Sequence, residues 1–232
     1  LIQFGVFDGP SSLNLENSSY SISSFVSDWD ETQYKEAFDQ VLAYIEAGDI
    51  YQANLTFSLF ADFEGDPWTF YKDLQLKQKV KHGAFVDLDS EISILSRSPE
   101  LFFKTDSEMN ISTRPMKGTQ PRDRDAEKDK KNLKFLKNDI KNRAENLMIV
   151  DLLRNDISRI SKVGTVKVPE LYKVETYETV HQMTSLIIGE MNKKTTVAEL
   201  FAALFPCGSI TGAPKIRAME IIHELEQRPR DI

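Results

Sequence analysis

The sequence predicts an α+β protein in which large, mainly antiparallel sheets carry helices on their outer sides. Side chains alternate between apolar and polar over residues 51–63, and short apolar runs broken by Asp-Ser pairs follow between residues 84 and 113. These are the patterns of strands and hairpins. The neighbouring segments are amphipathic and begin with helix-capping residues. We find no internal repeat and no long linker, so residues 1–232 are expected to form a single domain.

The composition is that of an ordinary globular protein, with 41% hydrophobic and 28% charged residues. No apolar run approaches the ~18 residues of a membrane-spanning helix, and the N-terminus shows no signal-peptide pattern. The net charge of −7 disfavours nucleic-acid binding, because that function normally requires a basic surface. The single cysteine, Cys207, excludes an internal disulfide and predicts a cytoplasmic protein.

The first expected elements are a short strand at residues 3–7 and a helix that begins after Asp30. Asp30 and Gln33 form a capping-box pattern, with Trp29 and Tyr34 placed as a hydrophobic staple. Gly48 is the expected helix stop. The side chains that form one apolar stripe at helical spacing are Tyr34, Phe38, Val41, Leu42 and Ile45.

Residues 51–63 are expected to form one long strand with a buried face, because every second side chain is apolar. Asp66-Pro67 opens a second helix, since proline is tolerated in a first turn. Asp89-Ser90 and Asp106-Ser107 mark the hairpin turns of the next region.

The second half of the sequence predicts mainly helices. Residues 122–139 are dense in charge and are expected to form a solvated helix face or an exposed loop, whereas residues 147–153 are apolar nearly all round and predict a buried helix. Thr196 and Glu199 cap a short helix. The last helix is expected at residues 213–225, with Pro214 in its first turn.

Four segments carry side chains capable of chemistry, and each also has a structural interpretation. Residues 98–100 (SPE) alone indicate a turn, and the lysine of residues 114–119 (RPMKGT) alone indicates a solvated turn residue. In residues 143–156 (RAENLMIVDLLRND), Glu145 lies at the start of an apolar helix and requires a cation, such as an arginine or a metal ion, as partner. The charged residues that follow it, expected to form structural ion pairs, are Asp151, Arg154 and Asp156.

The fourth segment, residues 205–215 (FPCGSITGAPK), places two glycines and two hydroxyls before a helix. This arrangement either caps the helix or offers backbone N–H groups to an anion.

Together, these segments resemble the chorismate-utilising enzymes, a family that includes the synthases of anthranilate, aminodeoxychorismate, isochorismate and salicylate. The resemblance extends from residues 48–52 (GDIYQ) to residues 217–222 (RAMEII), with the motifs in family order. It implies a large sandwich of two antiparallel sheets with helices on the outer sides.

Two positions favour one branch of this family. Isochorismate and salicylate synthases carry a water-activating lysine where this sequence has Gln52, and glutamine cannot act as a general base. Lys117 matches the nucleophilic lysine of the aminodeoxychorismate synthases, at a position where anthranilate synthases usually carry alanine. The resemblance therefore implies conversion of chorismate and ammonia to 4-amino-4-deoxychorismate, for 4-aminobenzoate and folate synthesis. Lys117 would attack the ring while Glu100 protonates the departing C4 hydroxyl.

The same resemblance implies a magnesium ion held by Glu145, and ammonia supplied by a separate glutamine amidotransferase subunit. The residues it assigns to substrate contact are Gly118, Thr119, His181, Ser209 and Lys215. The residues expected to converge on one cavity are Glu100, Lys117, Glu145, His181 and Ser209.

Family members continue beyond the point that corresponds to Ile232, so a shortened C-terminus is expected. A second metal-binding glutamate and an arginine for the pyruvyl carboxylate would lie in that continuation, and this chain alone is expected not to turn over chorismate. Two other interpretations stay open: an anthranilate synthase component I, and a non-catalytic member that keeps the fold.

Overall fold

The computed structural model describes residue 9, residues 18–88 and residues 92–230, so the strand expected at residues 3–7 and the turn expected at Asp89-Ser90 lie outside the described residues. Helices and antiparallel strand pairs confirm the α+β class. Contacts group the chain into two compact units, Leu1–Val26 with Phe60–Pro99 and Ser27–Leu59 with Glu100–Ile232. The single domain stays a prediction. No helix in the described part of the chain is long and apolar enough to cross a membrane.

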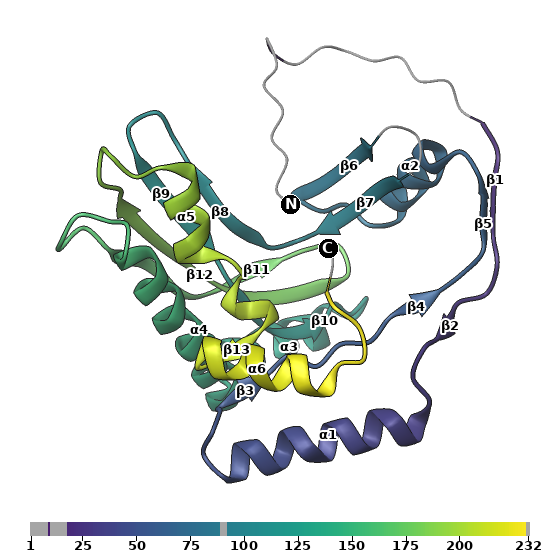
Figure 1. Cartoon of the computed structure of the whole chain (residues 1–232), viewed down its shortest axis with the longest axis horizontal. Helices are drawn as coiled ribbons and strands as arrows, with labels where there is room; N and C mark the ends of the chain where they lie inside the picture. The colour runs from purple at the N-terminus through teal and green to yellow at the C-terminus, as the bar shows by residue number, and fades with distance from the viewer. Residues whose placement is uncertain (1–8, 10–17, 89–91, 231–232) are drawn as a thin grey trace. The chain divides into compact units, whose positions relative to one another are not determined.

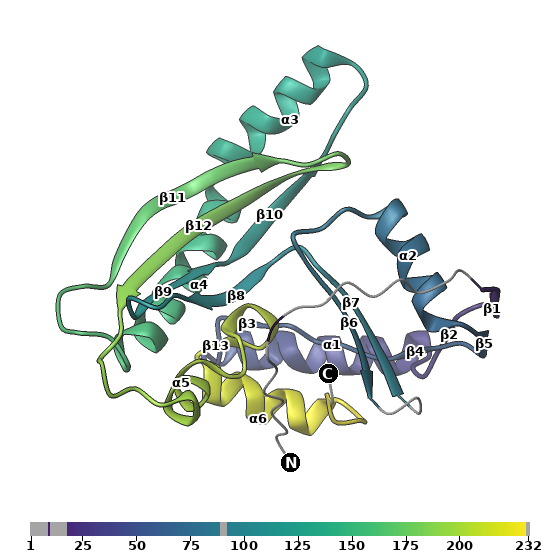
Figure 2. The same ribbon diagram turned by 90° about the horizontal axis from the view of Figure 1, so that it is seen from above.

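The first unit contains a strand pair, a helix and a hairpin. β1 (Tyr20–Ile22) pairs with β5 (Phe63–Gly65), and β6 (His82–Leu88) pairs with β7 (Ile92–Ser98), as Figure 2 shows. Helix α2 (Pro67–Lys77) begins where expected, because the Asp66 carboxylate accepts hydrogen bonds from the first free N–H groups. Trp68 and Tyr71 pack this helix on β6, with ring centroids 5.2 and 5.7 Å from Phe85.

An antiparallel sheet forms the centre of the second unit. Its strands are β8 (Leu101–Thr105), β9 (Asn110–Arg114), β10 (Met116–Pro121), β11 (Lys167–Thr176) and β12 (Val180–Glu190). The order is β10-β12-β9-β8, and β11 pairs with the other edge of β12. The turn expected at Asp106-Ser107 is confirmed, because the Asp106 carboxylate accepts the backbone N–H groups of Glu108 and Asn110, each at 2.9 Å.

Helices α3 (Ala126–Asn138) and α4 (Ile140–Ser158) pack against this sheet (Figure 1). Asp139 ends the first helix and caps the second, where its carboxylate accepts the Asn142 N–H at 2.8 Å. The expected buried helix is confirmed, since Ile149, Val150 and Leu153 pack with Ile111 of β9 and Ile187 of β12. The charged region is also confirmed as a solvated helix, of which Leu136 is the fully buried side chain.

Helix α1 (Glu31–Glu46) has the predicted ends but a different buried face. The capping box at its start is present, and Gly48 takes a φ of +83° at its end. The N–H groups of Gly48 and Asp49 bind the carbonyls of Ile45 and Tyr44 there. Val41 and Tyr44 pack with Ala218 and Ile221 of α6 (Lys215–Leu225), and Ala37 is also buried. The other four residues of the predicted stripe are between 36% and 42% exposed: Tyr34, Phe38, Leu42 and Ile45.

The long strand predicted at residues 51–63 is wrong. The structure has β3 (Gln52–Ala53) paired with β13 (Gly212–Ala213), β4 (Leu59–Phe60) paired with β2 (Val26–Ser27), and then β5. A strand needs a neighbour along its whole length, and these neighbours are two residues long. Tyr51 and Leu59, expected on the buried face, are 71% and 56% exposed.

The C-terminal segments follow the predicted order with one shift. α5 (Val197–Leu204) has the Thr196–Glu199 capping box, and η1 (Gly208–Ile210) is a short 3₁₀ turn. α6 (Lys215–Leu225) begins two residues later than expected, with Pro214 before its first turn. The cause is the pairing of residues 212–213 with β3: the Tyr51 N–H binds the Ala213 carbonyl at 2.7 Å and keeps it extended.

Candidate active site

Three predicted site residues meet in the second unit. Lys117 lies in β10, Glu100 directly precedes β8, and Ser209 lies in η1. The Lys117 Nζ donates to the backbone carbonyl of Ser209 at 3.2 Å, across 92 residues of sequence. The Ser209 side chain is near enough to the Glu100 carboxyl group to lower its pKa. We call Glu100, Lys117 and Ser209 the lysine cluster.

Glu100 has an environment suited to holding a proton. Burial raises the pKa of its carboxyl group, and this effect exceeds the opposing effects of the Ser209 hydroxyl, the Lys117 charge and the Met116 backbone N–H. A carboxyl group with a raised pKa retains its proton closer to neutral pH, so it can act as a general acid. The lysine cluster therefore combines an amine with a proton donor.

The backbone around Lys117 is fixed by its neighbours. The register between β10 and β12 shifts between Met116 and Thr119, so Lys117 lies in an irregular part of the strand. Gly118 adopts a φ of +92°, and a Cβ atom there would lie 2.8 Å from Asn142 Oδ1. Only glycine allows this approach to α4 without strain.

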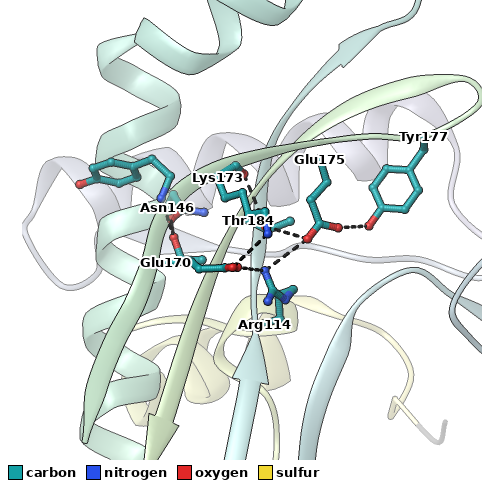
Figure 3. A network of polar contacts seen from close by, with 9 residues as sticks. Arg114, Asn146, Glu170, Lys173, Glu175, Tyr177 and Thr184 are labelled. Atoms are coloured by element: carbon teal, nitrogen blue, oxygen red, sulfur yellow. Dashed lines mark hydrogen bonds and ion pairs between the residues drawn. The ribbon is translucent and has the colours of Figure 1, made fainter.

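Arg114 anchors the strand that leads to Lys117, as Figure 3 shows. Its Nη1 donates to Glu170 at 2.7 Å and to Glu175 at 3.2 Å, which ties the end of β9 to β11. Arg114 holds the pKa of the Glu170 carboxyl group below its ordinary value, whereas burial and then Glu175 raise the pKa of Tyr177 to about 12. Sequence analysis missed these partners because they lie 56 and 61 residues away, where no local pattern links them.

Ser185 also anchors the segment between β9 and β10 that leads to Lys117. Its N–H donates to the Pro115 carbonyl at 3.2 Å, and its hydroxyl donates to Asn146 of α4 at 2.6 Å. The hydroxyl oxygen also accepts the Tyr172 N–H of β11 at 3.1 Å. Ser185 therefore joins the start of β10 to both a helix and the neighbouring strand.

Gln182, which sequence analysis did not assign, lies beside one expected substrate contact. The Thr119 hydroxyl donates to Gln182 Oε1 at 3.1 Å. His181, the preceding residue, is 1% exposed, and successive strand residues point to opposite faces. Its Nε2–H donates to the Asp129 carboxylate at 3.0 Å and its Nδ1 is bonded to the Thr176 hydroxyl at 2.9 Å. Both ring nitrogens are thus engaged by protein groups outside the lysine cluster, and substrate contact by His181 stays a prediction.

Lys215 is also engaged by the protein. Its Nζ lies 2.5 Å from Asp156 Oδ2 and donates to the Leu204 carbonyl at 3.2 Å. Burial raises the pKa of the Asp156 carboxyl group despite the nearby lysine. This pair joins the end of α4 to the start of α6, and a substrate contact by Lys215 stays a prediction. The expected ion pair between Asp151 and Arg154 is present, at 2.9 Å on the surface.

Glu145 does not form a metal site with the residues around it. Its side chain is 39% exposed, and the nearby cation is Lys141, with Nζ 3.9 Å from Glu145 Oε1. Among the residues that the structure describes, no group of three or more His, Cys, Asp or Glu side chains could hold a metal ion. The donor set therefore does not fit magnesium by itself, because Mg²⁺ requires several oxygen ligands in near-octahedral geometry. Magnesium binding by Glu145 stays a prediction.

This chain is similar to known proteins over most of its length. Residues 8–232 match the family model described as chorismate binding enzyme. The chain is 46% identical to aminodeoxychorismate synthase component 1 of Escherichia coli (strain K12) over 90% of this chain and 46% of that protein. It is 39% identical to anthranilate synthase component 1 of Thermus thermophilus over 89% of this chain and 44% of that protein.

A solved structure shows the same fold. Anthranilate synthase component I from Streptococcus pneumoniae TIGR4 aligns with a TM-score of 0.80 and 31% identity, over 89% of this chain and 45% of that chain. The chain thus spans about half the length of the relatives it matches.

Proposed function

Because this chain belongs to the chorismate-binding enzymes, we propose that the protein carrying it is component 1 of an aminodeoxychorismate synthase. It would convert chorismate and ammonia to 4-amino-4-deoxychorismate and water, and so serve 4-aminobenzoate and folate synthesis. The observation that carries this proposal is the convergence of Lys117 and Glu100 on Ser209. An amine nucleophile and a protonated carboxyl group are the two groups that substitution of a ring hydroxyl requires.

The proposed reaction has two displacement steps. After the Lys117 ammonium group has released a proton to solvent, its free amine forms a bond to the chorismate ring while the C4–O bond breaks, and Glu100 gives its proton to the departing oxygen, which leaves as water. Ammonia then bonds to C4, and the bond between the ring and Lys117 breaks to restore the free amine. Proton transfer by a positioned acid contributes about 10²- to 10⁴-fold to such a step.

The proposal includes two partners and a location. A glutamine amidotransferase would supply the ammonia, in keeping with the component 1 naming of the similar proteins. Glu145 would be one ligand of a magnesium ion that binds the substrate carboxylate. The location would be the cytoplasm, in keeping with the free, buried Cys207.

The product distinguishes this function from that of an anthranilate synthase, the second candidate because similar proteins include both. The complete gene product that carries this sequence would be incubated with chorismate, ammonium and magnesium. 4-Amino-4-deoxychorismate yields 4-aminobenzoate only after a lyase is added, whereas anthranilate is fluorescent and forms without one. Anthranilate as the product would overturn the proposal, and no turnover of chorismate would indicate a non-catalytic member.

Lys117→Ala tests the nucleophile. We expect amination to be lost while chorismate binding, measured by calorimetry, stays nearly unchanged, because the covalent bond forms only during reaction. Lys128→Ala, at an exposed position on α3, is the matched control and should leave turnover unchanged. Mass spectrometry of the wild type should detect an adduct on Lys117 if the intermediate accumulates. Full turnover by Lys117→Ala would rule out the proposed mechanism.

A further inference from the structure

Cys207 contacts the lysine cluster from the hydrophobic core. Its side chain is 7% exposed and packs in the cluster that contains Ile149 and Leu153 of α4. Its Sγ lies 3.1 Å from the Ser209 Oγ, and Ser209 itself is 5% exposed. The same hydroxyl is near enough to Glu100 to lower the pKa of its carboxyl group. A buried thiol, a hydroxyl and a carboxyl group therefore lie next to one another.

The number of available hydrogen atoms determines which group donates in the contacts among Cys207, Ser209 and Glu100. A serine hydroxyl has one hydrogen to donate and two lone pairs to accept with, whereas an ionised carboxylate only accepts. When Glu100 has given up its proton, the Ser209 hydrogen must point to Glu100 for a hydrogen bond to form between them. The contact between Cys207 and Ser209 then requires the thiol to be the donor.

The charges around Cys207 keep its thiol in the form that can donate. Burial raises the pKa of the thiol, hydrogen bonding with the side chain and the N–H group of Ser209 lowers it, and the nearby Glu100 raises it further. Lys215 acts in the opposite direction, but it is paired with Asp156 at 2.5 Å. Lys117, the other cation of the site, donates to the Ser209 carbonyl rather than to its hydroxyl.

We propose that Cys207 is a positioning residue of this site: its thiol donates a hydrogen bond to the Ser209 hydroxyl and so directs the hydroxyl hydrogen toward Glu100. The inference rests on the proposed function, since it takes Glu100 as the proton donor. As the proton leaves Glu100, negative charge develops on the carboxyl group, and the Ser209 O–H is already oriented to stabilise it. Such an interaction favours the transition state over bound substrate, because it strengthens only when the charge appears.

The first test does not depend on catalysis. The infrared S–H stretching band of Cys207 is isolated as the difference between the spectra of the wild-type gene product and its Cys207→Ala variant. We expect Ser209→Ala to shift this band toward that of a more weakly bonded thiol, and Lys128→Ala to leave it in place. A band that Ser209→Ala does not move would overturn the inference, whichever product the enzyme makes.

The second test uses turnover and its pH dependence. Cys207→Ala should lower kcat by about 2- to 10-fold with little change in KM, the range expected for one hydrogen bond. It should also move the alkaline limb of kcat to higher pH, because loss of the directed hydroxyl favours protonated Glu100. Cys207→Ser keeps a donor in the same place and should restore both properties. Equal losses in Cys207→Ala and Cys207→Ser would contradict a hydrogen-bonding role.

A double-variant cycle separates positioning from packing. In a Ser209→Ala background, Cys207→Ala should cause no further fall in kcat, because the thiol acts through that hydroxyl. Independent, multiplicative losses would show that Cys207 only fills space. If the wild type forms no 4-amino-4-deoxychorismate, the proposed function fails, and the infrared result still decides whether the thiol donates to Ser209.

Discussion

At the level of single residues, the pKa of Glu100 in the lysine cluster is set by opposing effects. Burial raises this pKa, whereas Ser209, Lys117 and the Met116 N–H lower it. The result stays above the ordinary value of 4.5. A small change in any of these contacts therefore changes how much of the enzyme carries the catalytic proton.

Glu100→Gln should lower kcat by about 10²- to 10⁴-fold, because the amide cannot donate a proton to the leaving oxygen. In the wild type, activity is present while Glu100 is protonated and is lost as pH rises through its raised pKa. The variant should lack this alkaline limb. Steady-state kinetics of the complete gene product across pH would measure both effects. Retention of the same limb in Glu100→Gln would assign it to another group.

Gly118 is the residue whose conformation fixes the position of Lys117. Gly118→Ala should destabilise the fold by about 1–2 kcal/mol through its left-handed backbone alone. It should also impair turnover, because the new Cβ would lie 3.0 Å from the Asn142 Cβ. Asn142 cannot move freely, since its backbone and side-chain N–H groups both bind Asp139 at 2.8 Å.

Gly48→Ala is the matched control for this effect. Gly48 has a φ of +83°, and a Cβ there would meet nothing within 4 Å. It should therefore lower the urea midpoint by a similar amount while leaving kcat unchanged. Equal loss of activity in both variants would show that Gly118 matters for stability and not for the placement of Lys117.

At the level of elements, helix ends were predictable and long-range strand pairing was not. Asp30 with Gln33 and Thr196 with Glu199 lie three residues apart, so the sequence contains the whole interaction. The strand expected at residues 51–63 depended on distant partners that proved two residues long.

In the candidate site, too, some contacts could be predicted from the sequence and others could not. The resemblance predicted that Glu100, Lys117 and Ser209 lie together, but it placed Glu145 and His181 with them. No strand was predicted at residues 180–190, so the contacts of His181 with Asp129 and of Gln182 with Thr119 could not be foreseen. The partners of Lys215 and Arg114 were equally hidden, because they belong to other elements.

The ion pair of Asp156 and Lys215 should contribute strongly to the packing of α4 with α6. Asp156→Ala should lower the free energy of unfolding by about 3–5 kcal/mol, because it leaves a lysine buried without its partner. The double variant Asp156→Leu with Lys215→Met should recover most of this loss, since it buries no charge. Urea denaturation would measure each change.

Asp151→Ala provides the comparison on the same helix. Asp151 pairs with Arg154 at 2.9 Å, but the two side chains are 59% and 51% exposed. Such surface pairs contribute less than about 1 kcal/mol. A loss in Asp156→Ala no larger than that in Asp151→Ala would show that the buried pair is not structurally important.

At the level of the whole chain, the lysine cluster belongs to one compact unit, since Glu100, Lys117 and Ser209 all lie in the second. That unit also contains carboxyl groups whose pKa is lowered and others whose pKa is raised. Asp106, Asp129, Glu170 and Glu199 have lowered values, chiefly through hydrogen bonds to neighbouring side chains and backbone N–H groups. Burial raises the values of Glu100 and Asp156. Stability should therefore depend on pH in both directions.

The acid side of this dependence should be governed most strongly by Asp129. The Arg122 side chain and the Asp123 N–H hold the pKa of its carboxyl group well below the ordinary value of 3.8, with a further contribution from His181. A group with a lowered pKa in the folded state contributes stability above its unfolded value, and this stability is lost as pH falls below it. We therefore expect the urea midpoint to begin to fall at about pH 5 and to go on falling below about pH 3, because the folded carboxylate stays ionised well below 3.8.

Asp129→Asn should make this acid dependence shallower, because the amide does not titrate. The variant should be less stable than the wild type at pH 6, where the carboxylate accepts from Arg122 at 2.8 Å and from His181 at 3.0 Å. The two proteins should converge as the pH is lowered, since protonation removes the same interactions from the wild type. Asp151→Asn, at an exposed position on α4, should instead run parallel to the wild type. Urea midpoints of the complete gene product at each pH would be compared as differences between variants, so that contributions from other parts of the protein cancel. An Asp129→Asn curve parallel to that of the wild type would mean that the Arg122–Asp129–His181 contacts do not control acid stability.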